Sequence, residues 1–171
     1  LSYDDVLLVP QYSDIRSRSE VSIKTDLGNG LVLGLPIIAS PMDTISETAM
    51  AISIGSLGGA AIIHRYNSIE MQSRMVAMAK DIANEKSKIE INVAHGHHIL
   101  MKEAIASIRD IFGTSLHIMA GNVATLDGIN SLADWGADSV RCNIGGGSIC
   151  STRVQTGHGV PGLQTIIDCA Q

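Results

Sequence analysis

The order of short apolar runs and longer amphipathic stretches constrains this chain more than any other feature. Apolar runs of strand length alternate along the sequence with stretches that carry an apolar stripe at helical spacing. The predicted strands cover residues 35–40, 58–64, 89–94, 116–120 and 139–144. The predicted helices cover residues 46–52, 68–80, 99–112, 126–135 and 161–170. Because strand–helix–strand repeats build parallel sheets with right-handed crossovers, we expect an α/β fold.

Local signals refine this pattern. Ser46 and Ser68 each precede a helical stripe, where a serine hydroxyl can accept a hydrogen bond from a free backbone N–H, so both are predicted helix caps. The methionines of the second helix are interpreted as core packing. The first 30 residues are rich in turn residues and predict an extended segment with short strands.

Composition and charge exclude several classes of protein. The chain has 171 residues, of which 45% are hydrophobic and 17% charged, and this suits one folded domain. A net charge of −5 and an aromatic content of 3% argue against a generic nucleic-acid binder. Three cysteines without a CxxC pair argue against a disulfide scaffold or a zinc ribbon. With no apolar run of membrane-spanning length, these features predict a reduced, cytoplasmic protein.

Polar or small residues follow the predicted strands at the points where the strands end. These residues are Ser40, His64, His95, Asn122 and Gly145. In parallel α/β folds the chemistry lies at the carboxyl ends of the strands, so this edge is the expected site. The pattern leaves both a closed barrel and an open doubly wound sheet available. A Gly-x-Gly-x-x-Gly motif after the first strand is absent, which weakens a dinucleotide-binding open sheet.

Residues 143–159 (NIGGGSICSTRVQTGHG) form the most informative stretch for chemistry. A thiol on a glycine-rich loop can reach an electrophilic carbon, and it attacks as the thiolate, so the loop around Cys150 must lower its pKa or supply a base. Thr152 and Arg153 are placed to orient water or to stabilise charge. The alternative interpretation is a tight turn with an inert, buried cysteine.

Several segments resemble, in matching order, the family of IMP dehydrogenases and GMP reductases. The loop GGGSICSTR is similar to the family's Gly-x-Gly-Ser-Ile/Val-Cys-x-Thr-Arg loop. The other similar segments are residues 2–10 (SYDDVLLVP), 40–44 (SPMDT), 63–64 (IH), 94–97 (AHGH) and 120–123 (AGNV). The resemblance covers nearly the whole chain, and the motifs together are highly specific.

The resemblance implies a (β/α)8 barrel that acts through a nucleotide held covalently on a cysteine. It implies that Cys150 attacks C2 of the purine and that Thr152 helps to activate water or ammonia. It also implies that Ser148 contacts phosphate. The other positions that it places at the nucleotide are Ser40, Met42, Asn122, Arg141 and Gly147.

The resemblance further implies a nicotinamide cofactor and a monovalent cation. The positions matching the cofactor side are Asn92, Ala94 and His95. The family usually has an aspartate where this chain has Asn92, and an amide still hydrogen-bonds a ribose hydroxyl but carries no charge. The backbone carbonyls that match a K⁺ site in the dehydrogenases belong to Gly145, Gly147 and Cys150. Gly146 stands where proline is common, which should loosen the loop.

The segments that resemble the family account for only part of its barrel. The predicted strands match the first, second, fourth, fifth and sixth strands of the family's barrel, whereas a barrel of this class needs eight. No segment matches the third strand, the loops after the seventh and eighth strands, the mobile flap or the catalytic base. We therefore expect residues 1–171 to form one partial catalytic barrel domain without a regulatory CBS domain. Unpaired sheet edges in such a piece favour assembly, aggregation or inactivity.

Three functions follow as hypotheses. Residues 40–44, Arg141 and residues 148–150 look more like dehydrogenases, which convert IMP to XMP with hydride transfer to NAD. Residues 17–20 and 93–96 look more like reductases, which convert GMP to IMP and ammonia with NADPH. We favour the dehydrogenase because its matches lie nearer the chemistry. The third hypothesis is a non-catalytic homologue that binds a nucleotide or a partner chain. The family is usually tetrameric, so we expect a homo-oligomer.

The remaining polar candidates are interpreted as structural. Histidines at the strand ends and loops are assigned to loops or to the nucleotide site rather than to a metal, because no second group of ligands has suitable spacing. These histidines are His64, His95, His97 and His98. The carboxylates interpreted as caps or turn residues are Asp4, Asp5 and Asp43. The cysteines interpreted as core residues are Cys142 and Cys169.

Overall fold

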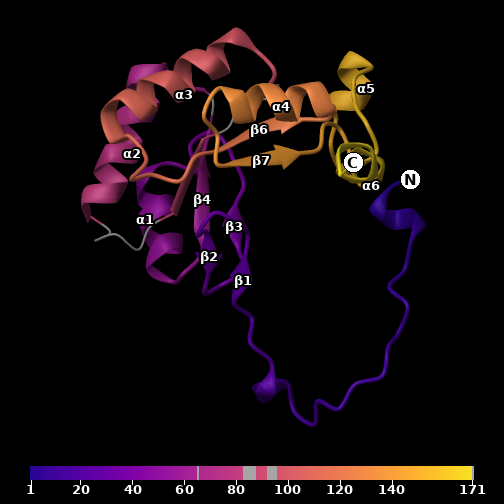
Figure 1. Ribbon diagram of the computed structural model, residues 1–171. Coiled ribbons are helices and arrows are strands. Elements are labelled where there is room, and N and C mark those ends of the chain that lie inside the picture. Colours follow the sequence, from indigo (N-terminus) through magenta and orange to yellow (C-terminus); the bar gives the residue numbers. More distant parts are fainter. Residues whose placement is uncertain (65, 83–87, 92–95, 171) are drawn as a thin grey trace.

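The computed structural model describes residues 1–64, 66–82, 88–91 and 96–170, and its strands and helices alternate as predicted (Figure 1). The strands are β1 (Thr25–Asp26), β2 (Val32–Leu33), β3 (Ile38–Ala39), β4 (Ala60–Ile63), β5 (Lys88–Ile91), β6 (Met119–Val123) and β7 (Ser139–Cys142). The α-helices are α1 (Thr48–Ser56), α2 (Ile69–Ile82), α3 (Ile99–Phe112), α4 (Leu126–Asp134), α5 (Thr152–Thr156) and α6 (Gly162–Cys169). Two 3-10 turns, η1 (Tyr3–Asp5) and η2 (Arg18–Glu20), precede them. The α/β fold class is confirmed.

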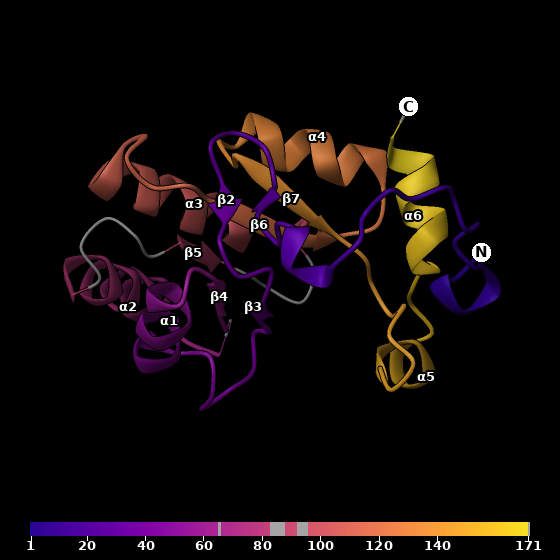
Figure 2. The same cartoon turned by 90° about the horizontal axis from the view of Figure 1, so that it is seen from below.

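The parallel strands form two separate groups. β4 pairs in parallel with β3 on one side and with β5 on the other, and β6 pairs in parallel with β7. Figure 2 shows α4 lying along β6 and β7, with α5 and α6 beyond the ends of these two strands. Within the described ranges no hydrogen-bonded ladder joins β5 to β6, and the sheet does not close into a barrel. The barrel that the resemblance implies is therefore not seen in this part of the chain.

Two glycines let neighbouring strands approach closely. A Cβ on Gly59 would lie 2.6 Å from the carbonyl oxygen of Ile37, beside the start of β4. A Cβ on Gly121, in β6, would lie 2.5 Å from the carbonyl oxygen of Arg141 in β7. Because real side chains do not tolerate such distances, only glycine allows both approaches.

One main apolar core joins the strands to the helices. All four residues of β4 are buried, as expected of a parallel strand covered on both faces. In α3 the buried positions recur at helical spacing, which places one apolar stripe against the strands. These positions are Met101, Ala104, Ile105 and Ile108. None of the helices in the described ranges is long and apolar enough to span a membrane.

The N-terminal segment makes few contacts before β1. The Leu1 carbonyl accepts a hydrogen bond from Gln164 N–H (3.0 Å), which ties the first residues to α6. The chain then loops away from the other elements up to β1 (Figure 1). Leu7, Leu8 and Tyr12 in this loop are 95%, 97% and 94% exposed, so these apolar side chains contribute nothing to the core.

Several element boundaries depart from the predictions: β3 is shorter than residues 35–40, and α1 ends at Ser56 rather than at residue 52. The strand predicted over residues 116–120 forms three residues later, at Met119–Val123. Ser46 was predicted to cap α1, but the cap position belongs to Glu47, and the buried Ser46 hydroxyl donates to the Ser40 carbonyl instead. The five-residue helix α5, directly after the cysteine loop, was not predicted. By contrast, the predicted cap Ser68 accepts a hydrogen bond from Met71 N–H (3.1 Å).

Candidate active site

Cys150 lies on the loop that follows β7, and a short antiparallel bridge closes the base of this loop. Ile144 pairs with Val160, whose N–H donates to the Ile144 carbonyl (2.9 Å). The Cys150 N–H donates to the Gly147 carbonyl (3.0 Å), which forms a tight turn around residues 147–150. The thiol therefore stands between the end of a parallel strand and the start of α5, where catalytic groups of α/β folds are found.

The surroundings of Cys150 favour its thiolate. Hydrogen bonds from Thr152, first from its side chain and then from its backbone, lower the pKa of the Cys150 thiol. The positive charge of Arg153 acts in the same direction, and slight burial acts against it. Burial is the largest cause that raises the pKa of both Cys142 and Cys169. Since the thiolate is the nucleophile, Cys150 is the cysteine suited to covalent chemistry.

Two of the three carbonyls expected to hold K⁺ accept hydrogen bonds from the chain itself. Arg153 Nη1 donates to the carbonyl oxygens of Gly145 (2.7 Å) and Gly147 (3.0 Å). The Gly147 oxygen also accepts the Cys150 N–H, so both of its lone pairs are used. In this arrangement the carbonyls of Gly145 and Gly147 do not fit a potassium site, because Arg153 already donates to both.

A cavity of about 300 Å³ lies beside the loop. The Ser148 hydroxyl and the Arg153 guanidinium give one wall a donor and a positive charge, and Asp4 brings a negative charge from the N-terminal turn. The position of Ser148 is compatible with the phosphate contact that the resemblance implies. None of the nucleotide-site candidates on β3, β6 and β7 lines this cavity: these are Ser40, Met42, Asn122 and Arg141.

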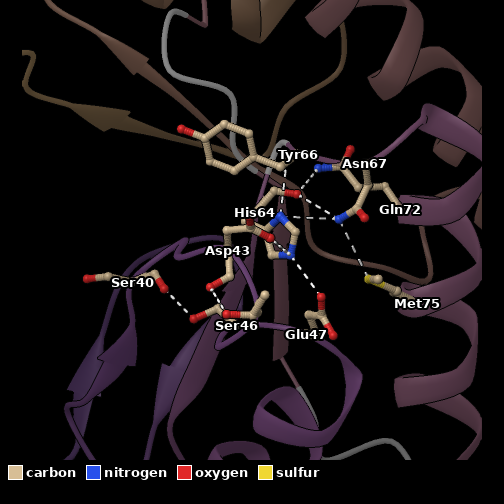
Figure 3. Close-up of polar contacts among 10 residues, drawn as sticks. Ser40, Asp43, Ser46, Glu47, His64, Tyr66, Asn67, Gln72 and Met75 are labelled. Carbon is tan, nitrogen blue, oxygen red and sulfur yellow. Dashed lines mark hydrogen bonds and ion pairs between the residues drawn. The ribbon is translucent and has the colours of Figure 1, made fainter.

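A second polar group lies at the carboxyl ends of β3 and β4, centred on His64 (Figure 3). The His64 side chain is 1% exposed. Its Nε2 lies 3.1 Å from Glu47 Oε1 and 3.8 Å from Asp43 Oδ1. The Tyr66 N–H donates to its Nδ1 (3.2 Å), and the Asn67 side-chain amide lies 3.3 Å from the same atom. The cluster ties the loop after β3 to the loop after β4.

The three side chains of this cluster have ligand atoms close enough to share a metal ion. The candidate ligands are Asp43, Glu47 and His64. The hydrogen bonds argue against that use: Nδ1 accepts the Tyr66 N–H, so the ring proton belongs on Nε2, the nitrogen that faces the carboxylates. A protonated Nε2 donates to Glu47 and cannot ligate a metal. The cluster is therefore a hydrogen-bonded support for the loops.

Asn122 offers an open hydrogen-bonding position on β6. Its Oδ1 is buried, and no hydrogen-bond partner is found for it within the described part of the chain. Buried acceptors of this kind are rare in folded proteins and call for a partner such as a ligand donor or a water. Its backbone carbonyl accepts the Gly96 N–H (2.6 Å), which links the segment after β5 to β6. The nucleotide-site role of Asn122 stays a prediction.

The predicted site residues do not gather at one point. Ser40 and Met42 are exposed at the end of β3, and Arg141 is half-buried in β7. In Figures 1 and 2 the cysteine loop and α5 lie well apart from β3. The cofactor-side candidates lie outside the described residues: these are Asn92, Ala94 and His95.

Several residues take the structural roles that we expected. His98 Nδ1 accepts a hydrogen bond from the Leu100 N–H (3.1 Å) and caps α3. The ring centroids of His97 and Trp135 lie 5.9 Å apart. Asp5 accepts the Ser2 N–H (2.7 Å) in a capping turn. Cys142 packs against the main core. Glu47 was not among the predicted residues, because its place beside His64 depends on the pairing of β3 with β4.

Comparison with known proteins identifies the family. A family model described as the IMP dehydrogenase / GMP reductase domain matches residues 1–90 and 82–171, which together span the chain. The chain belongs to the IMP dehydrogenase/GMP reductase family. The motifs around Cys150 and at the strand ends therefore resemble this family because the chain is a member of it.

Curated relatives carry the names of both enzymes. The chain is 33% identical to the GMP reductase of Buchnera aphidicola subsp. Acyrthosiphon pisum (strain Tuc7) over 199 residues, covering 99% of this chain and 57% of the relative. It is 28% identical to the inosine-5'-monophosphate dehydrogenase of Cryptosporidium parvum over 233 residues, covering 99% of this chain and 58% of the relative. The chain thus spans less than three-fifths of the length of these relatives.

The relatives are also longer than this chain within the aligned region. Both alignments run over more positions than the 171 residues of this chain, so each relative contains residues without a counterpart here. The family model matches the chain in two segments, residues 1–90 and 82–171. These segments overlap at residues 82–90, which include the end of α2 and the start of β5. In the structure β4 pairs directly and in parallel with β5.

Proposed function

We propose that this protein is a purine-nucleotide oxidoreductase that forms a covalent bond between the Cys150 sulfur and C2 of the purine. The observation that carries the proposal is the position of Cys150. Its thiol lies beyond a parallel strand, and hydrogen bonds from Thr152 lower its pKa. The buried Oδ1 of Asn122, which has no hydrogen-bond partner among the described residues, supports a ligand rich in hydroxyl or amine donors, such as a nucleotide.

The first candidate reaction is the oxidation of IMP to XMP. The Cys150 thiolate bonds to C2, and a hydride leaves that carbon. NAD, when bound, accepts the hydride. Water then adds to C2, its proton is passed on with the help of Thr152, and the carbon–sulfur bond breaks to release XMP and restore the thiolate. The resemblance of residues 40–44, Arg141 and residues 148–150 to dehydrogenases favours this direction.

The second candidate reaction is the reduction of GMP. Here the Cys150 sulfur displaces ammonia from C2, and hydride from NADPH at the same carbon releases the cysteine and gives IMP. The sequence identity is balanced between the two directions, since the chain is 33% identical to a GMP reductase over 199 residues and 28% identical to an IMP dehydrogenase over 233 residues. The resemblance of residues 17–20 and 93–96 to reductases supports this second direction. We also propose that the protein is cytoplasmic and forms a homo-oligomer, as the family usually forms tetramers. Sedimentation equilibrium measures the mass of the assembly and tests the oligomeric state.

The test is a pair of assays on the purified protein. One contains IMP and NAD, the other GMP and NADPH, and both follow the absorbance of the reduced nicotinamide. We expect turnover in one assay and a loss of about a thousandfold or more in Cys150→Ala. Cys169→Ala, which changes a cysteine in α6, is the matched control and keeps full turnover.

The outcomes separate the three hypotheses. Turnover of IMP supports the dehydrogenase, and turnover of GMP alone supports the reductase. Equal nucleotide binding by the wild-type protein and Cys150→Ala, without turnover in either assay, would contradict the enzyme proposal and indicate a non-catalytic homologue.

A further inference from the structure

The cysteine loop is built around the side chain of Arg153. The guanidinium Nη1 donates to the carbonyl oxygens of Gly145 (2.7 Å) and Gly147 (3.0 Å). The Cβ of Arg153 lies close to the backbone of two glycines. A Cβ added to Gly145 would lie 3.4 Å from Arg153 Cβ, and one added to Gly159 would lie 3.5 Å from it. The exposed Arg153 side chain therefore contacts both the start of the loop, at Gly145 and Gly147, and its end, at Gly159.

These contacts compete with a metal ion for the same oxygens. A monovalent cation in a protein replaces its water shell with backbone carbonyl oxygens. The Gly147 oxygen has two lone pairs, and the Cys150 N–H and Arg153 occupy both. A guanidinium stays charged throughout the physiological range, so it also repels a second cation placed between these carbonyls. The loop therefore already holds a positive charge where the dehydrogenases hold K⁺.

We propose that Arg153 is the resident cation of the cysteine loop, and that the loop keeps Cys150 in place without a monovalent metal ion. The proposal deepens the proposed function and rests on it only for the role of Cys150, because loop order is measurable without a substrate. Arg153 is thus a positioning residue: it acts on Cys150 by holding the Gly147 carbonyl to which the Cys150 N–H is bonded.

Amide hydrogen exchange in the loop tests the proposal. The probes are the N–H groups of Cys150 and Val160, which bond to the carbonyls of Gly147 and Ile144. Exchange is followed by NMR at one pH, in potassium chloride and in tetramethylammonium chloride of equal concentration. We expect the wild-type rates to agree within about twofold, because K⁺ gains no free carbonyl.

Variants of Arg153 provide the second arm. We expect Arg153→Ala to speed exchange at both amides by about tenfold in tetramethylammonium, and K⁺ to restore part of the protection through the freed carbonyls. Arg153→Lys keeps a charged donor and retains most of the protection. Arg74→Ala, which removes an exposed arginine paired with Glu70 on α2, is the control and leaves the loop unchanged.

Two results would overturn the proposal. One is a slowing of wild-type exchange at these amides by about fivefold or more in K⁺, which would show a working metal site. The other is an Arg153→Ala variant whose loop exchanges like that of Arg74→Ala. The wild-type comparison stands even if Arg153→Ala fails to fold. Failure of the enzyme assays leaves these measurements intact, so the two proposals fail independently.

Discussion

The group around His64 and the loop around Cys150 hold their polar atoms in opposite ways. His64 is 1% exposed, and its two ring nitrogens face Glu47 and the Tyr66 N–H. The Cys150 loop is open to solvent, and an exposed arginine bonded to backbone carbonyls holds it together. One region is a network around a buried histidine ring between strand ends, with Glu47 42% and Asp43 61% exposed, and the other is a surface turn.

This difference separates stability from reactivity. A hydrogen bond inside a protein is strong because water does not compete for it, and it is costly to break because the remaining partner stays buried. At the surface the same bond contributes little to folding, since water replaces it. We therefore expect changes near His64 to alter the free energy of unfolding, and changes near Cys150 to alter the chemistry of the thiol.

The largest expected effect is that of His64→Ala. The change removes a buried ring together with its hydrogen bonds to the Glu47 carboxylate and from the Tyr66 N–H. We expect the free energy of unfolding to fall by about 3 kcal/mol in urea denaturation. Arg153→Ala is the matched change in the other region and should cost less than about 1 kcal/mol. Equal losses in the two variants would remove the contrast between the regions.

Asp138 is an intermediate case, because its side chain is 34% exposed. Its Oδ2 accepts from Ile118 N–H (2.7 Å) and from Arg109 Nη2 (2.6 Å). Burial raises the pKa of Asp138, but these hydrogen bonds and the positive charge of Arg109 outweigh it, and the pKa lies below its usual 3.8. A lowered carboxyl pKa stabilises the fold above the unfolded value, and this stability is lost as the pH falls through the folded value.

Asp138→Asn tests this assignment. We expect a loss of about 1 kcal/mol in the free energy of unfolding near pH 7, shrinking as the pH falls below about 4. Asp110→Asn, at an exposed position of α3, should change little at either pH. A loss for Asp138→Asn that is the same at both pH values would exclude the carboxylate as its source.

A smaller effect is expected from Thr152→Ala. Removing the hydroxyl takes away the largest cause that lowers the pKa of Cys150, so less thiolate is present at neutral pH. We expect iodoacetamide to alkylate Cys150 about threefold to tenfold more slowly. Ser151→Ala is the control, because the Ser151 side chain makes no capping hydrogen bond to α5. A shift of the same size in both variants would assign the effect to the loop as a whole.

The smallest effect is expected from Glu47→Gln. A glutamine oxygen still accepts the His64 Nε2–H, so we expect a loss below about 1 kcal/mol in the free energy of unfolding. Glu47→Ala, which removes the acceptor, should cost more. If Glu47→Gln were as harmful as Glu47→Ala, the carboxylate charge would matter, as an ion pair or a metal ligand requires.

The fold could be predicted where apolar periodicity is strong. The buried run of β4 and the stripe of α3 are visible in the sequence and appear within two residues of their expected places. The strand β6 begins at Met119, because the Ile118 N–H donates to the Asp138 carboxylate and not to a backbone carbonyl of β7. Helix α5 has five residues and no buried face, so it carries no periodic signal.

The candidate site could be predicted only in part. The glycine-rich loop marks Cys150 and Thr152 by local sequence, and the structure places them on one turn. The cluster of Asp43, Glu47 and His64 depends on the pairing of β3 with β4, which sequence spacing alone does not reveal. The contacts of Arg153 likewise depend on how the loop folds back on itself.

The alkylation rates of the three cysteines test the central claim most directly. The rate for each is followed by mass spectrometry of its peptide near neutral pH, with and without IMP or GMP. We expect Cys150 to react faster than Cys142 and Cys169, because its pKa is lowered and theirs are raised, and a nucleotide to slow Cys150 alone. A Cys150 that reacts no faster than the other two, or that IMP and GMP leave unprotected, would contradict its role as the nucleophile.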